Sequence, residues 1–332
     1  MLIDSYGRTL DYLRVSITDR CNLRCIYCMP LEGVQWKPHN DMLTFEEILR
    51  IIKIMANQGV KRIRVTGGEP LLRRGTPSFI KNLKTISGIE KVTLTTNGLL
   101  LGAYLDEAAA LGENSLPDGI NISLDALDDK KYKYITRSGD AEPEMILSFI
   151  DRLLDKNIYV KINCVPVRSV NDEEIVSLAG LAKDKNIAVR FIELMPLGVA
   201  GSFRPIPGNE TAALVEKAYG KLIPFSHIEG GGPASYYSLE GFKGKIGFIN
   251  PVTHGFCETC NRLRLTSEGF LKLCLSNDLG VDLRELIRHG VSDGELTGIV
   301  IKAAAQKPGY HTLSGIYGTS EKHLCGMSKI GG

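Results

Sequence analysis

Short β-rich runs alternate with longer amphipathic segments over residues 1–195 of this chain. Six of the runs are predicted strands: 12–18, 62–67, 91–97, 119–125, 159–167 and 188–194. After the first run, Thr44 and Glu47 form a capping-box pattern ahead of apolar residues at helical spacing, and segment 172–185 repeats the helical pattern. Strands that alternate with helices pair in parallel through right-handed crossovers. We therefore predict an α/β fold, a partial (β/α)6 TIM-like barrel, with an open doubly wound sheet as the alternative. In both, functional residues gather at the carboxyl ends of the strands.

The character of the chain changes after residue 196. Glycine and proline are dense between Pro196 and Gly232, and the signals of helix weaken there. Helical patterns return over 282–288 and over roughly 295–305, before a glycine-rich tail. We expect a barrel over 1–195 and a C-terminal extension over 196–332 that packs across the barrel opening.

Three cysteines form a C-x3-C-x2-C array directly after the first predicted strand: Cys21, Cys25 and Cys28. Thiolates are the usual ligands of iron–sulfur clusters, and three of them hold three corners of a [4Fe–4S] cube. The fourth iron then stays open to a small molecule, as catalytic metal sites keep one position free. A zinc site or a disulfide pair is the alternative interpretation.

A second set of three thiols forms a C-x2-C-x13-C array in the extension: Cys257, Cys260 and Cys274. It predicts a second [4Fe–4S] cluster with an open iron, and a zinc site with His254 as fourth ligand is the alternative. Arg262 and Arg264 follow at once and share one face if they lie on a strand. Two guanidinium groups beside a cluster suit an anionic ligand, although paired arginines on a strand also occur as a solvated face.

The charge balance bears on the possible partners. Forty Lys and Arg residues stand against 38 Asp and Glu, a net charge of +2, so no global field favours nucleic acid or a membrane. No apolar run approaches the ~20 residues of a transmembrane helix, and the N-terminus lacks a signal or transit pattern. Eight cysteines without a secretory signal indicate metal or redox sites. We expect a cytoplasmic protein with no nucleic-acid partner and no membrane attachment.

Several motifs, taken in order, resemble two related groups of enzymes. The first array, in LRVSITDRCNLRCIYCMP, resembles the radical S-adenosylmethionine (SAM) superfamily. Along nearly its whole length the chain resembles the GTP 3′,8-cyclase family, which catalyses the first step of molybdenum cofactor biosynthesis. The further motifs that carry this resemblance are RVTGGEPLLRR, TLTTNG, NISLDAL, VKIN, RFIELMPLG, CETCNRLRLT and the terminal MSKIGG.

The resemblance implies a lyase that uses SAM and two [4Fe–4S] clusters. SAM would chelate the open iron of the first cluster, and one electron would split it to a 5′-deoxyadenosyl radical. That radical would abstract hydrogen from ribose C3′ of GTP, and C3′ would attack guanine C8 to give (8S)-3′,8-cyclo-7,8-dihydroguanosine 5′-triphosphate. One alternative is another radical SAM enzyme with an auxiliary cluster, such as a peptide-modifying maturase. Another is a non-enzymatic iron–sulfur or zinc protein that binds a partner.

The resemblance also assigns roles to residues of this chain. The expected SAM contacts are Tyr27, Gly68, Ser123 and Met195. The expected GTP contacts are Arg14, Arg64, Thr95, Lys161, Arg262, Leu263 and Arg264, with Arg62, Arg73, Arg74 and Arg190 as lesser candidates. The residues expected to take part in catalysis are Arg262, Arg264 and the C-terminal pair Gly331 and Gly332.

Taken without the resemblance, the same residues have structural alternatives. Arg14 faces away from its apolar neighbours in LRVSI, so it enters a barrel lumen or pairs with Glu69 or Glu193. Tyr27 and Met195 would otherwise be ordinary core residues.

Expected partners follow from the resemblance alone. They are GTP as substrate, a flavodoxin-type electron donor, a second copy in a homodimer, and the cyclic pyranopterin monophosphate synthase that takes up the product. Cys164 and Cys325 are assigned to neither cluster, and Cys164 is expected to be a small buried hydrophobic residue.

Overall fold

The six predicted strands form the centre of one twelve-stranded sheet in the computed structural model, which describes residues 1–139, 142–226, 232–311 and 313. They are β1 (Tyr12–Ser16), β2 (Arg62–Thr66), β3 (Lys91–Thr96), β4 (Gly119–Ser123), β5 (Tyr159–Cys164) and β6 (Ala188–Ile192). They lie side by side in sequence order, and each neighbouring pair is parallel. The predicted α/β fold is therefore confirmed, and each strand ends one to three residues before its predicted end.

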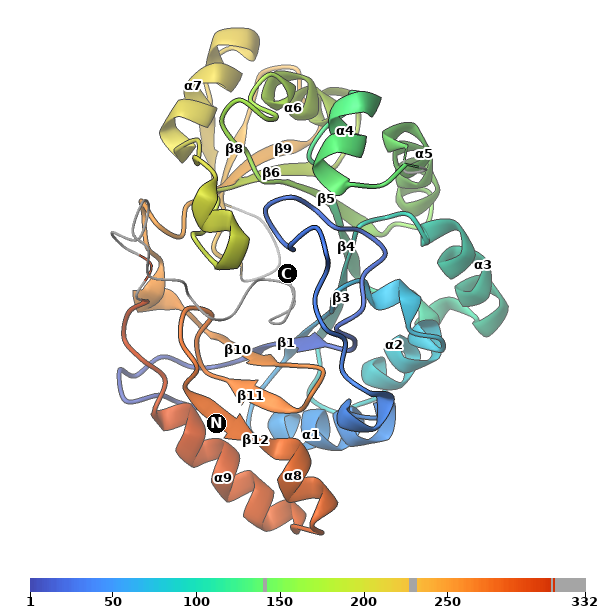
Figure 1. Cartoon of the computed structure of the whole chain (residues 1–332), viewed down its shortest axis with the longest axis vertical. Helices are drawn as coiled ribbons and strands as arrows, with labels where there is room; N and C mark the ends of the chain where they lie inside the picture. Colours follow the sequence, from blue (N-terminus) through green and yellow to red (C-terminus); the bar gives the residue numbers. More distant parts are fainter. Residues whose placement is uncertain (140–141, 227–231, 312, 314–332) are drawn as a thin grey trace.

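Helices follow the strands and cover the outer side of the curved sheet (Figure 1). They are α1 (Phe45–Asn57), α2 (Thr76–Lys84), α3 (Leu101–Leu111), α4 (Asp129–Thr136), α5 (Pro143–Leu154) and α6 (Glu174–Asp184). The capping box of α1 is confirmed: Thr44 Oγ1 accepts from the Glu47 N–H at 3.2 Å, and the Thr44 N–H donates to the Glu47 carboxylate at 2.8 Å. Apolar residues of these helices and of the strands form one core, with Ile48 and Ile52 fully buried.

The C-terminal region adds strands to both edges of the central six, which the sequence did not predict. β10 (Arg262–Leu265) pairs in parallel with β1, and β9 (Lys245–Ile249) pairs in parallel with β6. Beyond them lie β11 (Phe270–Lys272) and β12 (Gly280–Asp282) on one side, and β8 (Ser235–Ser238) and β7 (Ile223–Phe225) on the other. The sheet thus runs from β12 to β7 as an open arc, which fits a partial barrel (Figure 1).

Three helices belong to this C-terminal region. The predicted segments 282–288 and 295–305 correspond to α8 (Leu283–Arg288) and α9 (Asp293–Ala305). A third helix, α7 (Gly208–Tyr219), lies in the stretch where the sequence signals of helix weaken. Its N-cap is Pro207, which offers no side-chain oxygen to the first turn, so the usual start signal is missing.

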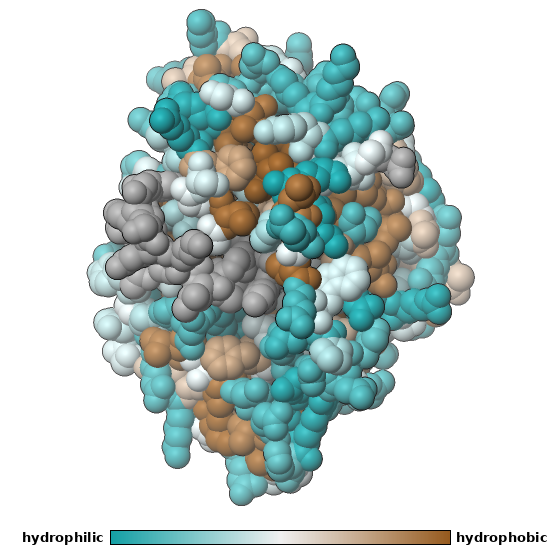
Figure 2. Space-filling model, in the orientation of Figure 1, coloured by the Kyte–Doolittle hydropathy of each residue, from teal (hydrophilic) through white to brown (hydrophobic). Residues whose placement is uncertain are grey.

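One face of the molecule carries both hydrophilic and hydrophobic side chains (Figure 2). Hydrophilic side chains predominate around the rim of the face seen in Figure 2, and hydrophobic side chains appear in patches nearer its middle. Among the described residues, no helix is both long enough and apolar enough to span a membrane.

Candidate functional site

A cavity of about 1030 Å³ lies within the arc of the sheet. Pockets for small-molecule ligands are usually roughly 300–1,000 Å³, so this cavity lies at the upper end of that range. The lining includes the lesser candidate Arg190 and sixteen of the expected cluster ligands and SAM or GTP contacts: Arg14, Cys21, Cys25, Tyr27, Cys28, Arg64, Gly68, Thr95, Ser123, Lys161, Met195, Cys257, Cys260, Arg262, Arg264 and Cys274. Leu263 does not line it, because its side chain is buried in the core. Gly331 and Gly332 lie outside the described residues.

Two glycines hold the first cysteine array against the end of β2. The Gly68 N–H donates to the Thr18 carbonyl at 2.7 Å, and the Glu69 N–H donates to the Arg20 carbonyl at 2.7 Å. A Cβ on Gly68 would overlap the Arg20 carbonyl group, and one on Gly67 would lie 2.7 Å from the Thr18 oxygen. Glycine is needed here because protein backbone approaches it closely, so GGEP positions the loop that begins at Cys21.

Glu69 ties this junction to β3. Its buried carboxylate accepts from the Leu71 N–H (3.0 Å), the Thr96 hydroxyl (2.8 Å) and the Asn97 N–H (2.7 Å). Burial raises the pKa of Glu69 to about 7, although these three donors act in the opposite direction. The Asn97 side chain donates in turn to Asn22 Oδ1 at 2.8 Å, beside the first cysteine.

Asp125 fixes the tyrosine inside the array. The Tyr27 hydroxyl donates to Asp125 Oδ2 at 2.5 Å, and the Val165 N–H donates to Oδ1 at 2.8 Å. Burial raises the pKa of Asp125 to about 6, and both donors partly offset this. Because the folded pKa lies above the ordinary value, ionisation of Asp125 opposes folding. Its contribution to stability is largest below about pH 4 and is lost as the pH rises through about 6.

This contact gives a pH-dependent prediction. Tyr27→Phe should lower the free energy of unfolding by about 1.5–3 kcal/mol at pH 7.5, where it removes a donor from an ionised carboxylate. At pH 5, where Asp125 is mostly protonated, the loss should be only about 0.5–1.5 kcal/mol. Urea unfolding of the purified protein under reducing conditions measures both values. Tyr134→Phe, at a residue that is 63% exposed, is the control, and equal losses at the two pH values would contradict the prediction.

The thiols of the first array line the cavity, and burial is the main influence on their pKa values. Burial raises the pKa of Cys25 well above its ordinary value and that of Cys28 to about 12, with the neighbouring thiols adding to both shifts. Such thiols stay protonated at neutral pH unless a metal displaces the proton. The donor set therefore fits a group that brings its own positive charge, as an iron–sulfur core does.

Three arginines stand in register on neighbouring strands. Arg14 on β1 pairs with Arg264 on β10 and with Arg64 on β2. Adjacent strands lie about 4.8 Å apart, so the three guanidinium groups follow one another along one line of the sheet. Burial lowers the pKa of Arg14 well below its ordinary value, and Arg264 and Arg64 lower it further. Burial and then Arg262 lower the pKa of Arg264 to about 10. An anion with several charges is what would relieve this repulsion.

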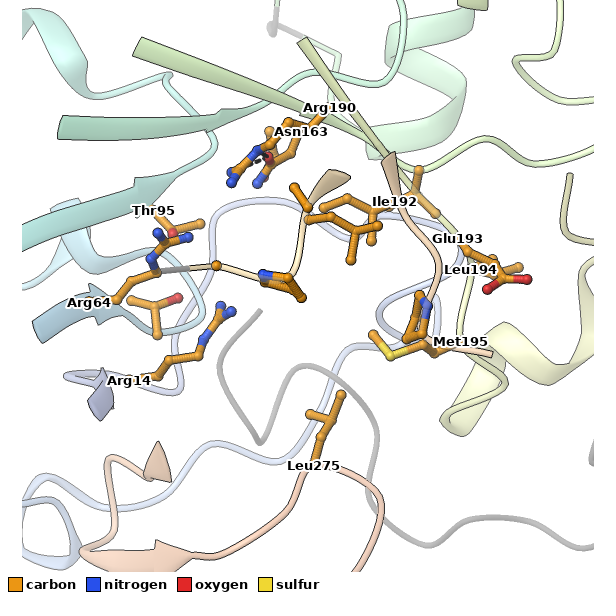
Figure 3. A pocket seen from close by; sticks show the side chains of 18 of the residues that line it. Arg14, Arg64, Thr95, Asn163, Arg190, Ile192, Glu193, Leu194, Met195 and Leu275 are labelled. Carbon is orange, nitrogen blue, oxygen red and sulfur yellow. Dashed lines mark hydrogen bonds between the residues drawn. The ribbon is translucent and has the colours of Figure 1, made fainter. Parts of the chain in front are cut away.

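The glutamates proposed as partners of these cations are engaged by other groups. Glu69 accepts the three donors described above, and Glu193 accepts from the Val252 and Thr253 N–H groups at 2.9 and 3.0 Å. In Figure 3, Arg14, Arg64 and Arg190 come from different strands and approach the same space, while Glu193 points away from it.

Two further cations stand on β5 and β6. Arg190 donates to the side-chain oxygens of Asn163 (2.5 and 2.9 Å) and Asn121 (2.7 Å), all of them neutral acceptors (Figure 3). The Lys161 ammonium lies 5.1 Å from the ring centre of Tyr159 and 6.0 Å from that of Tyr236. Both cations line the cavity, so it is electropositive although the chain is nearly neutral.

Of the other three lesser candidates, none lines the cavity. Arg73 donates to the carbonyl groups of Ile17 and Leu43, and Arg62 forms an ion pair with Asp11 at 3.1 Å. Arg73 therefore binds backbone carbonyl groups, and Arg62 forms an ion pair with an acidic side chain.

The thiols of the second array line the same cavity: Cys257, Cys260 and Cys274. Their surroundings are more positive than those of the first array. Burial acts to raise the pKa of Cys260, but Arg262 and then Lys307 outweigh it, and this pKa lies below its ordinary value. Arg262 Nη2 lies 3.7 Å from the Cys260 sulfur. His254 is exposed and does not line the cavity.

The lining residues that were not identified from the sequence include Asp125, Asn163, Tyr236 and Lys307. Asp125 had a usable signal, because an acid two residues after a predominantly apolar strand is expected at the functional edge of a parallel sheet. Tyr236 and Lys307 had none, since nothing local indicates that β8 and the end of α9 reach this cavity.

Two family models match the chain. The model described as Radical SAM superfamily covers residues 15–182, and the model described as Molybdenum Cofactor Synthesis C covers residues 187–313. The first thus includes Cys21, Cys25 and Cys28, and the second includes Cys257, Cys260 and Cys274.

Relatives named GTP 3′,8-cyclase match over their full length. The protein of Clostridium perfringens (strain 13 / Type A) is 44% identical over 329 residues, which are 99% of each chain. That of Syntrophomonas wolfei is 42% identical over 335 residues, the whole of each chain.

Solved structures resemble this one at low identity. SuiB of Streptococcus suis bound to S-adenosylmethionine gives a TM-score of 0.55 at 15% identity, over 87% of this chain and 68% of SuiB. SuiB bound to the precursor peptide SuiA gives a TM-score of 0.58 at 14% identity, over 94% of this chain and 76% of SuiB. At such identities the likeness concerns the fold alone.

Proposed function

Because this chain belongs to the GTP 3′,8-cyclase family of the radical SAM superfamily, we propose that its cavity converts GTP to (8S)-3′,8-cyclo-7,8-dihydroguanosine 5′-triphosphate. The protein is a radical SAM lyase, and the reaction is the first step of molybdenum cofactor biosynthesis. The observation that carries the proposal is the line of Arg264, Arg14 and Arg64 in a cavity shared with both sets of thiols.

We assign the first array to a [4Fe–4S] cluster with SAM on its open iron. When bound, this pair supplies the 5′-deoxyadenosyl radical for the reaction. The chain's own part is to position it: Tyr27, Gly68, Ser123 and Met195 are the proposed SAM contacts, and all four line the cavity. The Gly68 and Tyr27 contacts described above hold the loop and limit how the cofactor can move.

GTP is assigned to the basic part of the cavity. Arg14, Arg64, Arg264, Lys161 and Thr95 are the proposed contacts of the triphosphate and ribose, with Arg262 beside the second array. Arginine binds phosphate oxygens through two parallel hydrogen bonds, so three in a row suit a chain of phosphates. Leu263 can contribute only its backbone, since its side chain is in the core.

The second array is assigned to a second [4Fe–4S] cluster that anchors GTP. A structural zinc ion takes four protein ligands, so a zinc site here would need a fourth side chain besides the three thiols. The exposure of His254 argues against the zinc alternative.

Other parts of the assignment rest on the family. We propose that residues 1–195 carry the SAM chemistry, that 196–332 carry the second cluster, and that Gly331 and Gly332 reach the site. The proposed partners are a flavodoxin-type electron donor, a second copy of the chain, and cyclic pyranopterin monophosphate synthase downstream. A reducing cytoplasm is the proposed location, because six thiols must stay free to bind iron.

Anaerobic incubation with SAM, dithionite and GTP tests the function. We expect 5′-deoxyadenosine to form only when GTP is present, together with a cyclised nucleotide detected by mass spectrometry. ATP is the matched control, since it offers the same triphosphate without guanine. Equal 5′-deoxyadenosine with and without GTP, or its formation only with a peptide, would refute the cyclase assignment.

A further inference from the structure

Lys307 lies two residues beyond the end of α9 and is 2% exposed, although it is a lysine. Its ammonium donates to the Arg262 carbonyl at 2.9 Å and to the Leu273 carbonyl at 2.6 Å. Both acceptors are neutral, and among the described residues no carboxylate forms an ion pair with it. A buried ammonium with two neutral acceptors is costly unless an anion lies nearby.

Its two acceptors belong to the segments that carry the second set of thiols. Arg262 follows Cys260 by two residues, and Leu273 directly precedes Cys274. A single side chain therefore joins the backbones of two segments that are separated in sequence and must stay at a fixed spacing to share one cluster.

Arg8 binds the backbone at Cys257, the remaining cysteine of the second array. Its guanidinium donates to the Cys257 carbonyl at 2.6 Å and to the Pro308 and Gly309 carbonyls at 2.7 and 3.1 Å. Its Nε donates to Asp4 at 2.5 Å, so Arg8 has its own counter-ion. Lys307 donates only to neutral carbonyl groups among the described residues, so its positive charge can interact with an anion bound in the cavity.

The cavity offers that anion if a cluster is bound. Three thiolates around a [4Fe–4S]²⁺ core give a net charge of about −1, and the cavity is lined by Lys307 as well as by the three cysteines. Positive charge and hydrogen bonding around a cluster favour its reduced form and raise its reduction potential.

We propose that Lys307 is a positioning residue of the second cluster, which fixes the spacing of its ligating segments and supplies its counter-charge. This rests on the proposed second cluster. A role in the core alone would require only its hydrogen bonds to the two carbonyl groups, whereas the proposed role also requires its charge.

The test uses the reconstituted holoenzyme and variants Lys307→Met and Lys307→Arg. Iron and sulfide are counted, and an EPR-monitored redox titration gives the midpoint of each cluster, with the first recognised by its change on adding SAM. In Lys307→Met we expect a more negative midpoint for the second cluster, or its selective loss, with the first cluster unchanged. Lys307→Arg should restore the wild-type midpoint, and Lys302→Met, at an exposed position on α9, should change nothing.

The outcomes separate the two proposals. Wild-type protein with only one cluster would refute the second cluster itself. Two clusters with an unchanged second midpoint in Lys307→Met would overturn the role of Lys307 alone. If Lys307→Met loses both clusters, Lys307→Gln decides, because it keeps a donor for the carbonyl groups and removes the charge. An unchanged midpoint in that variant would also overturn the proposal.

Discussion

Replacement of Cys25 by alanine is expected to abolish formation of 5′-deoxyadenosine, because only two thiolates of the first array remain. Cys25 is the middle cysteine of the array and lines the cavity, and burial raises the pKa of its thiol well above the ordinary value. Two ligands do not hold a cube firmly, so iron should fall from about eight to about four atoms per chain. Iron and sulfide analysis with an assay for 5′-deoxyadenosine measures both effects.

Cys164→Ala provides the matched control. This cysteine is fully buried in β5 and belongs to neither array, which confirms its expected place as a small core residue. Its loss should cost about 1 kcal/mol of stability and leave iron content and turnover unchanged. A Cys25→Ala enzyme that still cleaves SAM would show that the first array is not the SAM cluster.

The sequence predicted those parts of the fold that local patterns specify. The central strands, the capping box at Thr44 and the positions of α8 and α9 follow from β-branched runs, helical spacing and start signals. α7 was missed because Pro207 and Gly208 stand where a capping side chain is usual. Pairing between distant segments leaves no such local trace, so the places of β9 and β10 at the two edges could not be predicted.

The same limit applies to the site. The two cysteine arrays and the residues of the short motifs could be identified, and the structure brings nearly all of them to one cavity. The arrangement of these residues relative to one another could not be predicted, because the register of Arg14 with Arg264 depends on the pairing of β10 with β1. Lys307, which acts through other residues, became visible only through its contacts.

Replacement of Arg264 by alanine is expected to lower kcat/KM for GTP by about 100-fold, while both clusters remain. Truncating one partner of a buried charge pair costs about 2–5 kcal/mol, and about 2.7 kcal/mol corresponds to that factor. Arg264 touches the triphosphate in the proposed complex but provides no ligand to either cluster, so iron content should not change. Arg262→Ala should behave similarly, with an added change in the EPR signal of the second cluster, because Arg262 lies 3.7 Å from the Cys260 sulfur.

A purely structural role for Arg264 makes a different prediction, and thermal unfolding distinguishes the two. Without GTP, the guanidinium groups of Arg264, Arg14 and Arg64 repel one another, and burial adds to the cost of their charge. Removing one of them should therefore leave the melting temperature of the GTP-free enzyme unchanged or raise it, and should reduce the stabilisation that GTP confers. Arg152→Ala, which removes an exposed arginine on α5, should keep the full GTP effect. A large fall in stability or loss of either cluster in Arg264→Ala would mean that this arginine supports the fold rather than the substrate.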